Sequence, residues 1–322
     1  MALGSSKKEL ALFYDKLGEL HRAGVPLDEG LVLASSGLVS ADLRAAARGV
    51  TEAVARGKSL ADGFARAKGA ISDVDVALIR VGETEGRLDE TFARLSALHT
   101  TGHRDQMKVL LALIYPAFLL GSAVLLPPLG TWFRDGLGAY LGTVARTTLL
   151  LLGPFAGLGL LYWLAATYFP SGFDRFKLEV PIVGTTLRKL AAARFNRSLA
   201  LLIDAGVDLR TSLQLAGSSL GNRYLQDRFR GAARVLDRGG SLAEALAVTN
   251  VFPLDGLHFV AVGERSGELP KMLSKAAETH EHEARQVITA ILAAIPVLLY
   301  LMVAVYIGYT VVSFYTNSFK LP

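Results

Sequence analysis

Hydrophobic residues recur along this chain with the period of a helix. Over residues 8–22, Leu10, Phe13 and Leu17 fall on one helical face, and residues 195–202 repeat the pattern. No segment alternates apolar and polar residues with the period of two that a half-buried strand requires. The pattern therefore predicts an all-α chain.

Three short motifs occur twice in the same order. Residues 23–27, 57–62 and 81–88 read AGVPL, GKSLAD and VGETEGRL, while residues 205–209, 239–244 and 262–269 read AGVDL, GGSLAE and VGERSGEL. The first two motifs return after 182 residues and the third after 181. Self-similarity over this length predicts two copies of one helical bundle, each with about six helices.

The third helix of each copy is predicted from an apolar stripe with the spacing 4, 3, 4. One helical face repeats with this spacing, so a single helix is expected at this point in each copy. The stripe is formed by Leu43, Ala47, Val50 and Val54 in the first copy and by Leu225, Phe229, Ala232 and Leu236 in the second.

The motifs themselves are typical of helix caps and turns. Ser59 with Asp62, and Ser241 with Glu244, have the spacing of a capping box at a helix start. The segments 82–86 and 263–267 are interpreted as turns before the last helix of each copy. Backbone roles in caps and turns are assigned to Gly24, Gly57, Gly82, Gly86, Gly206, Gly240, Gly263 and Gly267.

Three stretches without a charged residue are long enough to cross a bilayer: 109–129, 147–169 and 287–315. No apolar run precedes residue 109, so a cleaved signal peptide is not expected. The predicted order is therefore bundle 1–108, span 109–129, external loop 130–146, span 147–169, bundle 170–286, span 287–315 and external tail 316–322.

Two crossings separate the predicted bundles, so both are expected on the same side of the membrane. Lys and Arg flank the spans on the bundle side more often than on the other, which predicts a cytoplasmic location for both bundles. The net charge is +5, but acidic and basic residues nearly balance in each bundle, so a nucleic-acid partner is not expected. The chain has no cysteine, which excludes disulfides and thiolate metal sites.

Candidate chemistry in the sequence is sparse. Gly57-Lys58-Ser59 resembles the end of a phosphate-binding loop, but Glu52 stands where that loop needs its first glycine. His99 and His103 lie four residues apart and could present two imidazoles to a metal, yet no third ligand is evident. The sequence thus predicts no catalytic residue, cofactor or metal.

Glu83 and Glu264 hold the same place in the two copies. One interpretation is a local role, in which each carboxylate binds backbone amides; others are contact with a partner or a surface cation, and, least favoured, catalysis. The charged residues proposed for partner contact are Glu83, Glu85, Arg87, Glu264, Arg265 and Glu268.

The doubled set of motifs, each followed by an apolar span, resembles the type II secretion system F family over residues 8–315. Phe252-Pro253, which precedes the motif at residues 262–269, also fits this family. The copies are not equivalent, because Ala70-Ile71-Ser72 occupies that place in the first copy and Asp208 replaces Pro26 in the second.

This resemblance implies a non-enzymatic platform protein in the inner membrane of a type II secretion or type IV pilus machine. It implies cytoplasmic bundles that contact a hexameric ATPase, and a membrane part that helps to assemble pilin-like subunits. Other inner-membrane platform components and further copies of the same chain are the remaining implied partners. One alternative is a subunit of a membrane transporter or channel, which charged residues inside the spans would favour. A second is a membrane-bound enzyme, which a cytoplasmic pocket with convergent ionisable groups would favour.

Overall fold

The computed structural model describes residues 2–67, 69–100, 114–115, 118–126, 128–168 and 170–318. Within these ranges the secondary structure is helical and contains no β-strand, which confirms the prediction of an all-α chain. The described residues divide into two compact units, Met1–Gln106 with Val180–Ala284, and Met107–Glu179 with Arg285–Pro322.

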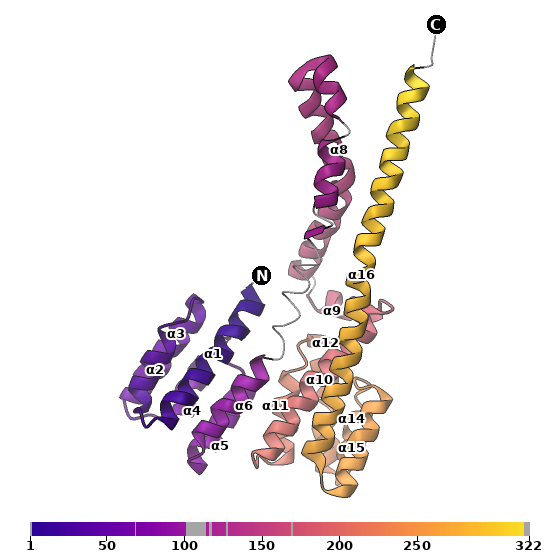
Figure 1. The fold of residues 1–322 in the computed structure, drawn as a ribbon. Helices are drawn as coiled ribbons and strands as arrows, with labels where there is room; N and C mark the ends of the chain where they lie inside the picture. Colours follow the sequence, from indigo (N-terminus) through magenta and orange to yellow (C-terminus); the bar gives the residue numbers. More distant parts are fainter. Residues whose placement is uncertain are drawn as a thin grey trace. The chain divides into compact units, whose positions relative to one another are not determined.

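The first unit contains both copies of the repeated sequence (Figure 1). The first copy forms α1 (Ala2–Arg22), α2 (Leu27–Ser35), α3 (Ala41–Ala55), α4 (Leu60–Arg66), α5 (Asp73–Glu85) and α6 (Leu88–Thr100). The second copy forms α10 (Val183–Asp204), α11 (Leu209–Ser218), α12 (Arg223–Phe229), α13 (Ala232–Asp237), α14 (Leu242–Ala247), α15 (Leu254–Ser266) and the start of α16 (Leu269–Ser318). The helices therefore follow one order in both copies.

The third helix differs between the copies. The single helix predicted around Leu225 and Leu236 is wrong, because the structure has the two short helices α12 and α13 in its place. The break falls at Gly231, and glycine is a poor helix former since it loses the most backbone entropy on ordering. Arg230 and Arg234 instead close tight turns with the residues three positions before them.

Aromatic side chains form the centre of each copy. In the first, the Tyr14 ring stacks on Phe92 with 6.3 Å between centroids, and it also contacts Phe64. In the second, Phe195 packs against Phe229 at 5.0 Å. Each such pair contributes about 0.5–1.5 kcal/mol beyond the area it buries. The helical face predicted from the apolar pattern is therefore the buried face.

The first helix of each copy ends in the same way. At Gly24, φ is 83°, and the Val25 N–H donates to the Leu20 carbonyl at 3.0 Å. At Gly206, φ is 82°, and the matching bond from Val207 is also 3.0 Å. This is the Schellman ending, whose left-handed residue is normally glycine. Positive φ is shared by Gly57, Gly86, Gly239 and Gly267, so in the second Gly-x-Ser motif the left-handed residue is Gly239 and not Gly240.

The Gly-Glu-x-x-Gly segments are not turns throughout. Residues 82–85 form the last turn of α5, and residues 263–266 form the last turn of α15. Only the final glycines, Gly86 with φ 69° and Gly267 with φ 73°, reverse the chain. The prediction of turns over 82–86 and 263–267 is therefore wrong except at Gly86 and Gly267. The apolar face keeps each segment helical in spite of its first glycine.

The first glycine of each segment is required for close packing. A β-carbon on Gly82 would lie 2.9 Å from the Thr91 Cβ, and one on Gly263 would lie 2.9 Å from the Met272 Cβ. Neither distance is compatible with a normal van der Waals contact. The missing side chain thus lets α5 pack directly on α6, and α15 on the start of α16.

The second unit contains α8 (Leu129–Tyr168), α9 (Pro170–Glu179) and the remainder of α16. Gly136, with φ 84° and ψ 175°, breaks α8 into two helical pieces. The Thr147 hydroxyl lies 3.0 Å from the Tyr306 hydroxyl and joins α8 to α16.

Among the described residues, one helix is long and apolar enough to cross a membrane, over Leu269–Tyr309 of α16. It contains most of the predicted span 287–315. Eight residues of the predicted span 109–129 lie outside the described residues. The layout with three spans remains a prediction.

Gly82→Ala is expected to destabilise the protein by about 1–3 kcal/mol, because the new methyl group overlaps Thr91. Gly49→Ala is the matched control, since Gly49 lies inside α3 with open space around its Cα. It should stabilise the protein by about 0.5–1 kcal/mol through helix propensity. Thermal unfolding of the detergent-solubilised chain measures both; equal effects of the two variants would contradict the packing role.

Candidate functional site

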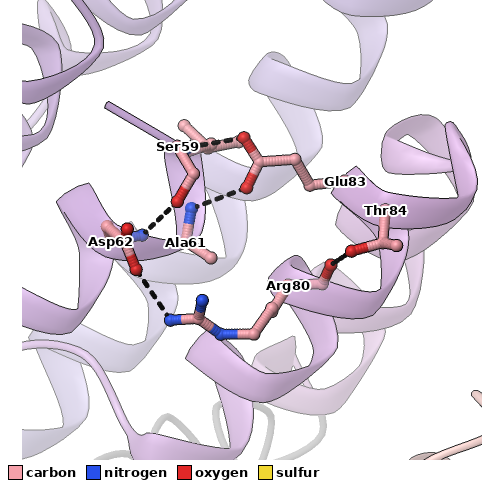
Figure 2. Close-up of polar contacts among 7 residues, drawn as sticks. Ser59, Ala61, Asp62, Arg80, Glu83 and Thr84 are labelled. Carbon is pink, nitrogen blue, oxygen red and sulfur yellow. Dashed lines mark hydrogen bonds and ion pairs between the residues drawn. The ribbon is translucent and has the colours of Figure 1, made fainter. Parts of the chain in front are cut away.

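The Glu83 carboxylate binds the beginning of α4. It reaches across from α5 and accepts hydrogen bonds from the Leu60 N–H at 2.7 Å and the Ala61 N–H at 3.0 Å (Figure 2). The Ser59 hydroxyl accepts a hydrogen bond from the next amide, that of Asp62, at 3.1 Å. Three consecutive amides at the start of the helix are thereby satisfied.

These bonds have a clear physical basis. The first amides of a helix have no acceptor within the helix, and leaving them buried without one is unfavourable. The aligned peptide dipoles also place partial positive charge at this end, which attracts a carboxylate. Glu83 therefore links α5 to α4 through charge-assisted hydrogen bonds, which are about twice as strong as neutral ones.

The second copy repeats this arrangement. Glu264 on α15 accepts from the Leu242 N–H at 2.6 Å and the Ala243 N–H at 3.3 Å, at the start of α14. The Ser241 hydroxyl accepts a hydrogen bond from the Glu244 N–H. The Glu244 carboxylate in turn accepts from the Ser241 N–H at 3.1 Å, which completes a capping box. The paired carboxylates are named the Glu clamps below, for Glu83 and Glu264.

The reciprocal half of the capping box is absent from the first copy. Asp62 there bonds to Arg80 of α5 at 2.9 Å, on the exposed surface (Figure 2). Hydrogen bonds from Arg80 and then from Ser59 lower the pKa of Asp62. Aspartate is one methylene shorter than the Glu244 of the second copy, so it meets a neighbouring helix instead of its own cap.

The residues proposed for partner contact fall into two groups. Glu83 and Glu264 are half-buried and bind backbone amides, which is the local role among the interpretations of the sequence. The other four, Glu85, Arg87, Arg265 and Glu268, are exposed at the helix junctions. Arg87 pairs with Glu90 at 2.6 Å, and Glu268 pairs with Lys271 at 2.9 Å.

A buried polar network in the first copy has no counterpart in the sequence predictions. Asp75 is fully buried and accepts from Tyr14 at 3.3 Å and from Ser72 at 2.8 Å, while His99 Nε2 lies 3.0 Å from it. Burial, followed by the Asp75 charge, raises the pKa of Tyr14 well above its usual value. The Ser72-x-x-Asp75 spacing could have revealed the helix cap at the start of α5. It could not have revealed that Asp75 bonds to Tyr14 of α1 and His99 of α6.

This network does not have the order of a Ser-His-Asp triad. Ser72 and His99 both bond to Asp75, so the imidazole does not lie between the hydroxyl and the carboxylate as the triad requires. His103, the second residue of the metal pair considered from the sequence, lies outside the described residues. His99 is thus held by a carboxylate inside the helical unit.

The equivalent position in the second copy is different. Gly256 stands where the first copy has Asp75, and His280 stands where it has His99. Burial lowers the pKa of His280, while the carboxylates of Asp255 and Glu283 oppose this shift. The two copies therefore share the Glu clamps but differ in their buried polar groups.

Comparison with known proteins agrees with the duplication. A sequence model of the family described as "Type II secretion system (T2SS), protein F" matches the chain twice, over residues 13–133 and 195–316. The chain belongs to the type II secretion system protein F family. The two matched stretches are the two copies of the repeat with the sequence that follows each of them.

Relatives of the F family come from both secretion and pilus systems. A type II secretion system protein F of Xanthomonas campestris is 31% identical and covers 94% of the chain and 80% of the relative. A protein of the same name in Pseudomonas aeruginosa is 30% identical over 88% and 75%. A type IV pilus assembly protein PilC of Thermus thermophilus is 29% identical over 99% and 84%.

Glu83→Gln is expected to destabilise the F-family fold of the first copy by about 2 kcal/mol, because the charge and one of two acceptor oxygens are lost. Glu264→Gln should act similarly in the second copy. Glu85→Gln, two residues from Glu83 but exposed, is the control and should leave unfolding unchanged. Chemical denaturation measures all three, and a Glu85 effect as large as that of Glu83 would refute the clamp.

The raised pKa of Tyr14 predicts that the folded chain loses stability at alkaline pH. Its pKa is raised in the folded chain, so its contribution is complete below the usual tyrosine pKa of 10.0 and is lost as the pH rises beyond it. Tyr14→Phe should weaken this alkaline loss, although it costs about 1 kcal/mol at neutral pH by removing the bond to Asp75. Denaturation at pH 9 and pH 11 tests the difference, with Tyr224→Phe as control; equal pH dependence in all three chains would contradict it.

Proposed function

We propose that this protein is a non-enzymatic inner-membrane platform of a type II secretion or type IV pilus machine, which couples a cytoplasmic hexameric ATPase to the assembly of pilin-like subunits. The observation that carries this proposal is the double match to the family, in which each copy of one helical repeat precedes an apolar stretch. Homologues named for both machines support the general role.

The proposed membrane layout has three spans, 109–129, 147–169 and 287–315, with both repeats in the cytoplasm. The apolar part of α16 supports the last span, since Leu298, Tyr309 and Val312 are more than half exposed where no protein covers them. In α8, Leu149 and Trp163 are exposed in the same way. Apolar surfaces of this kind suit lipid, neighbouring copies, other platform components or the apolar helix of a pilin-like subunit.

The proposed contact surface for the ATPase consists of the exposed charges at the α5–α6 and α15–α16 junctions. Glu85, Arg87, Arg265 and Glu268 are available to a partner, because their bonds are to neighbours on the surface. Exposed ion pairs contribute little to folding, so these residues can be changed without loss of the fold. In each copy the Glu clamp binds the start of a short helix to α5 or α15, the helix that leads into the junction.

Reversal of these charges tests the proposal. A variant with all four charges reversed is expected to lose about tenfold or more in affinity for the secretion or pilus ATPase of the same cell. Its substitutions are Glu85→Arg, Arg87→Glu, Arg265→Glu and Glu268→Arg. Glu52→Arg is the control, because it reverses an equally exposed charge on α3. Co-purification from detergent-solubilised membranes measures the effect.

Two results would contradict this account. If the wild-type chain recovers none of the ATPases of its own cell, the coupling role fails. If the chain with four reversals binds as well as wild type, the contact surface is elsewhere.

A further inference from the structure

The second repeat buries a histidine that has no hydrogen-bond partner. His280 is fully buried, and neither Nδ1 nor Nε2 forms a hydrogen bond. A buried polar group without a partner costs about 1–3 kcal/mol, so it requires an explanation.

The first repeat shows what has changed around this ring. There the equivalent His99 is held by Asp75 at 3.0 Å. In the second repeat Gly256 replaces that aspartate, and a β-carbon on Gly256 would lie 2.5 Å from His280 Nε2. The His280 ring therefore occupies the space in which the first repeat holds a carboxylate.

Two other carboxylates face the opposite nitrogen of the ring. Asp255, at the start of α15, has its Oδ2 3.8 Å from His280 Nδ1. Glu283, one turn along α16, has its Oε2 3.9 Å from the same nitrogen. The three ligand atoms all lie within 4.8 Å of one another.

These separations are too long for hydrogen bonds but suit a shared ion. A hydrogen bond needs roughly 2.7–3.2 Å between heavy atoms. A tetrahedral ion with bonds of about 2.1 Å holds its ligand atoms about 3.4 Å apart. The two carboxylate oxygens, at 3.8 and 3.9 Å from His280 Nδ1, would have to move towards the ring and towards each other to reach that separation.

We propose that Asp255, His280 and Glu283 bind one divalent transition-metal ion of the zinc class. One imidazole with two carboxylates is a typical donor set for such ions, whereas Mg²⁺ and Ca²⁺ prefer oxygen ligands alone and in larger number. The Asp255 side chain is 51% exposed, so the ion can enter from solvent and keep a water as its fourth ligand. The bound ion would tie the start of α15 to α16 at the end of the first unit.

Lys189 competes with the ion in this arrangement. Its Nζ lies 2.9 Å from Glu283 Oε2, where it balances the charge of that carboxylate in the metal-free protein. Metal binding requires this pair to separate, and Lys189 is sufficiently exposed to turn away. Removing the lysine charge should therefore strengthen metal binding, an effect that unspecific surface binding would not show.

The test uses the full chain in detergent, purified without a histidine tag and stripped with EDTA. Calorimetric titration with Zn²⁺ should show one ion per chain, and Co²⁺ should give the visible absorption of a tetrahedral site. Asp255→Asn, which changes a half-exposed side chain, should lower the Zn²⁺ affinity by about tenfold or more. Lys189→Met should raise it, and His280→Gln should abolish binding.

The matched control is His282→Ala, which removes an exposed imidazole two residues from His280. It should leave the Zn²⁺ affinity unchanged. The proposal is overturned if wild type and Asp255→Asn bind Zn²⁺ equally, or if His282→Ala causes the loss. Thermal midpoints measured in EDTA keep a folding defect of any variant distinct from a loss of ligand.

Discussion

The structure depends on a carboxylate that reaches from one helix to the first backbone amides of another, which have no acceptor in their own helix. Short helices such as α4 and α14 are marginal alone, because few internal bonds offset the cost of starting them. Glu83 and Glu264 supply acceptors at the first turn, where the helix has none of its own. Each Glu clamp thus fixes a short helix against the longer helix that leads into the last helix of the repeat.

Around this shared contact the two repeats have diverged in their buried polar groups. The first encloses an aspartate bonded to Tyr14, Ser72 and His99, whereas the second has a glycine there and leaves His280 unpaired. The two repeats therefore share their order of helices but differ in the polar side chains buried between them. Such asymmetry suits the proposed platform role, in which the two repeats would meet different neighbours.

Patterns local in the sequence were predictable, and contacts across helices were not. Ser59, Ser241 and the left-handed Gly24 act within a few residues, so spacing alone identifies their type of structure. The helical character of residues 82–85 was missed, because glycine there serves packing against Thr91 and not a turn. The donors that bind the carboxylates of Glu83 and Asp75, the Leu60 N–H and the Tyr14 hydroxyl, lie 23 and 61 residues away, so these contacts depend on how the helices pack.

Hydrogen exchange at the amides of Leu60, Ala61, Leu242 and Ala243 tests the Glu clamps most directly. These amides have no acceptor inside their helices, so only the clamps can protect them. In wild type we predict slow exchange in peptides that begin at Ser59 and Ser241. Glutamine keeps only one acceptor oxygen and no charge, so Glu83→Gln should speed exchange within the first pair alone, and Glu264→Gln within the second. Rapid exchange at these amides in the wild-type chain, or no change in either variant, would contradict the account.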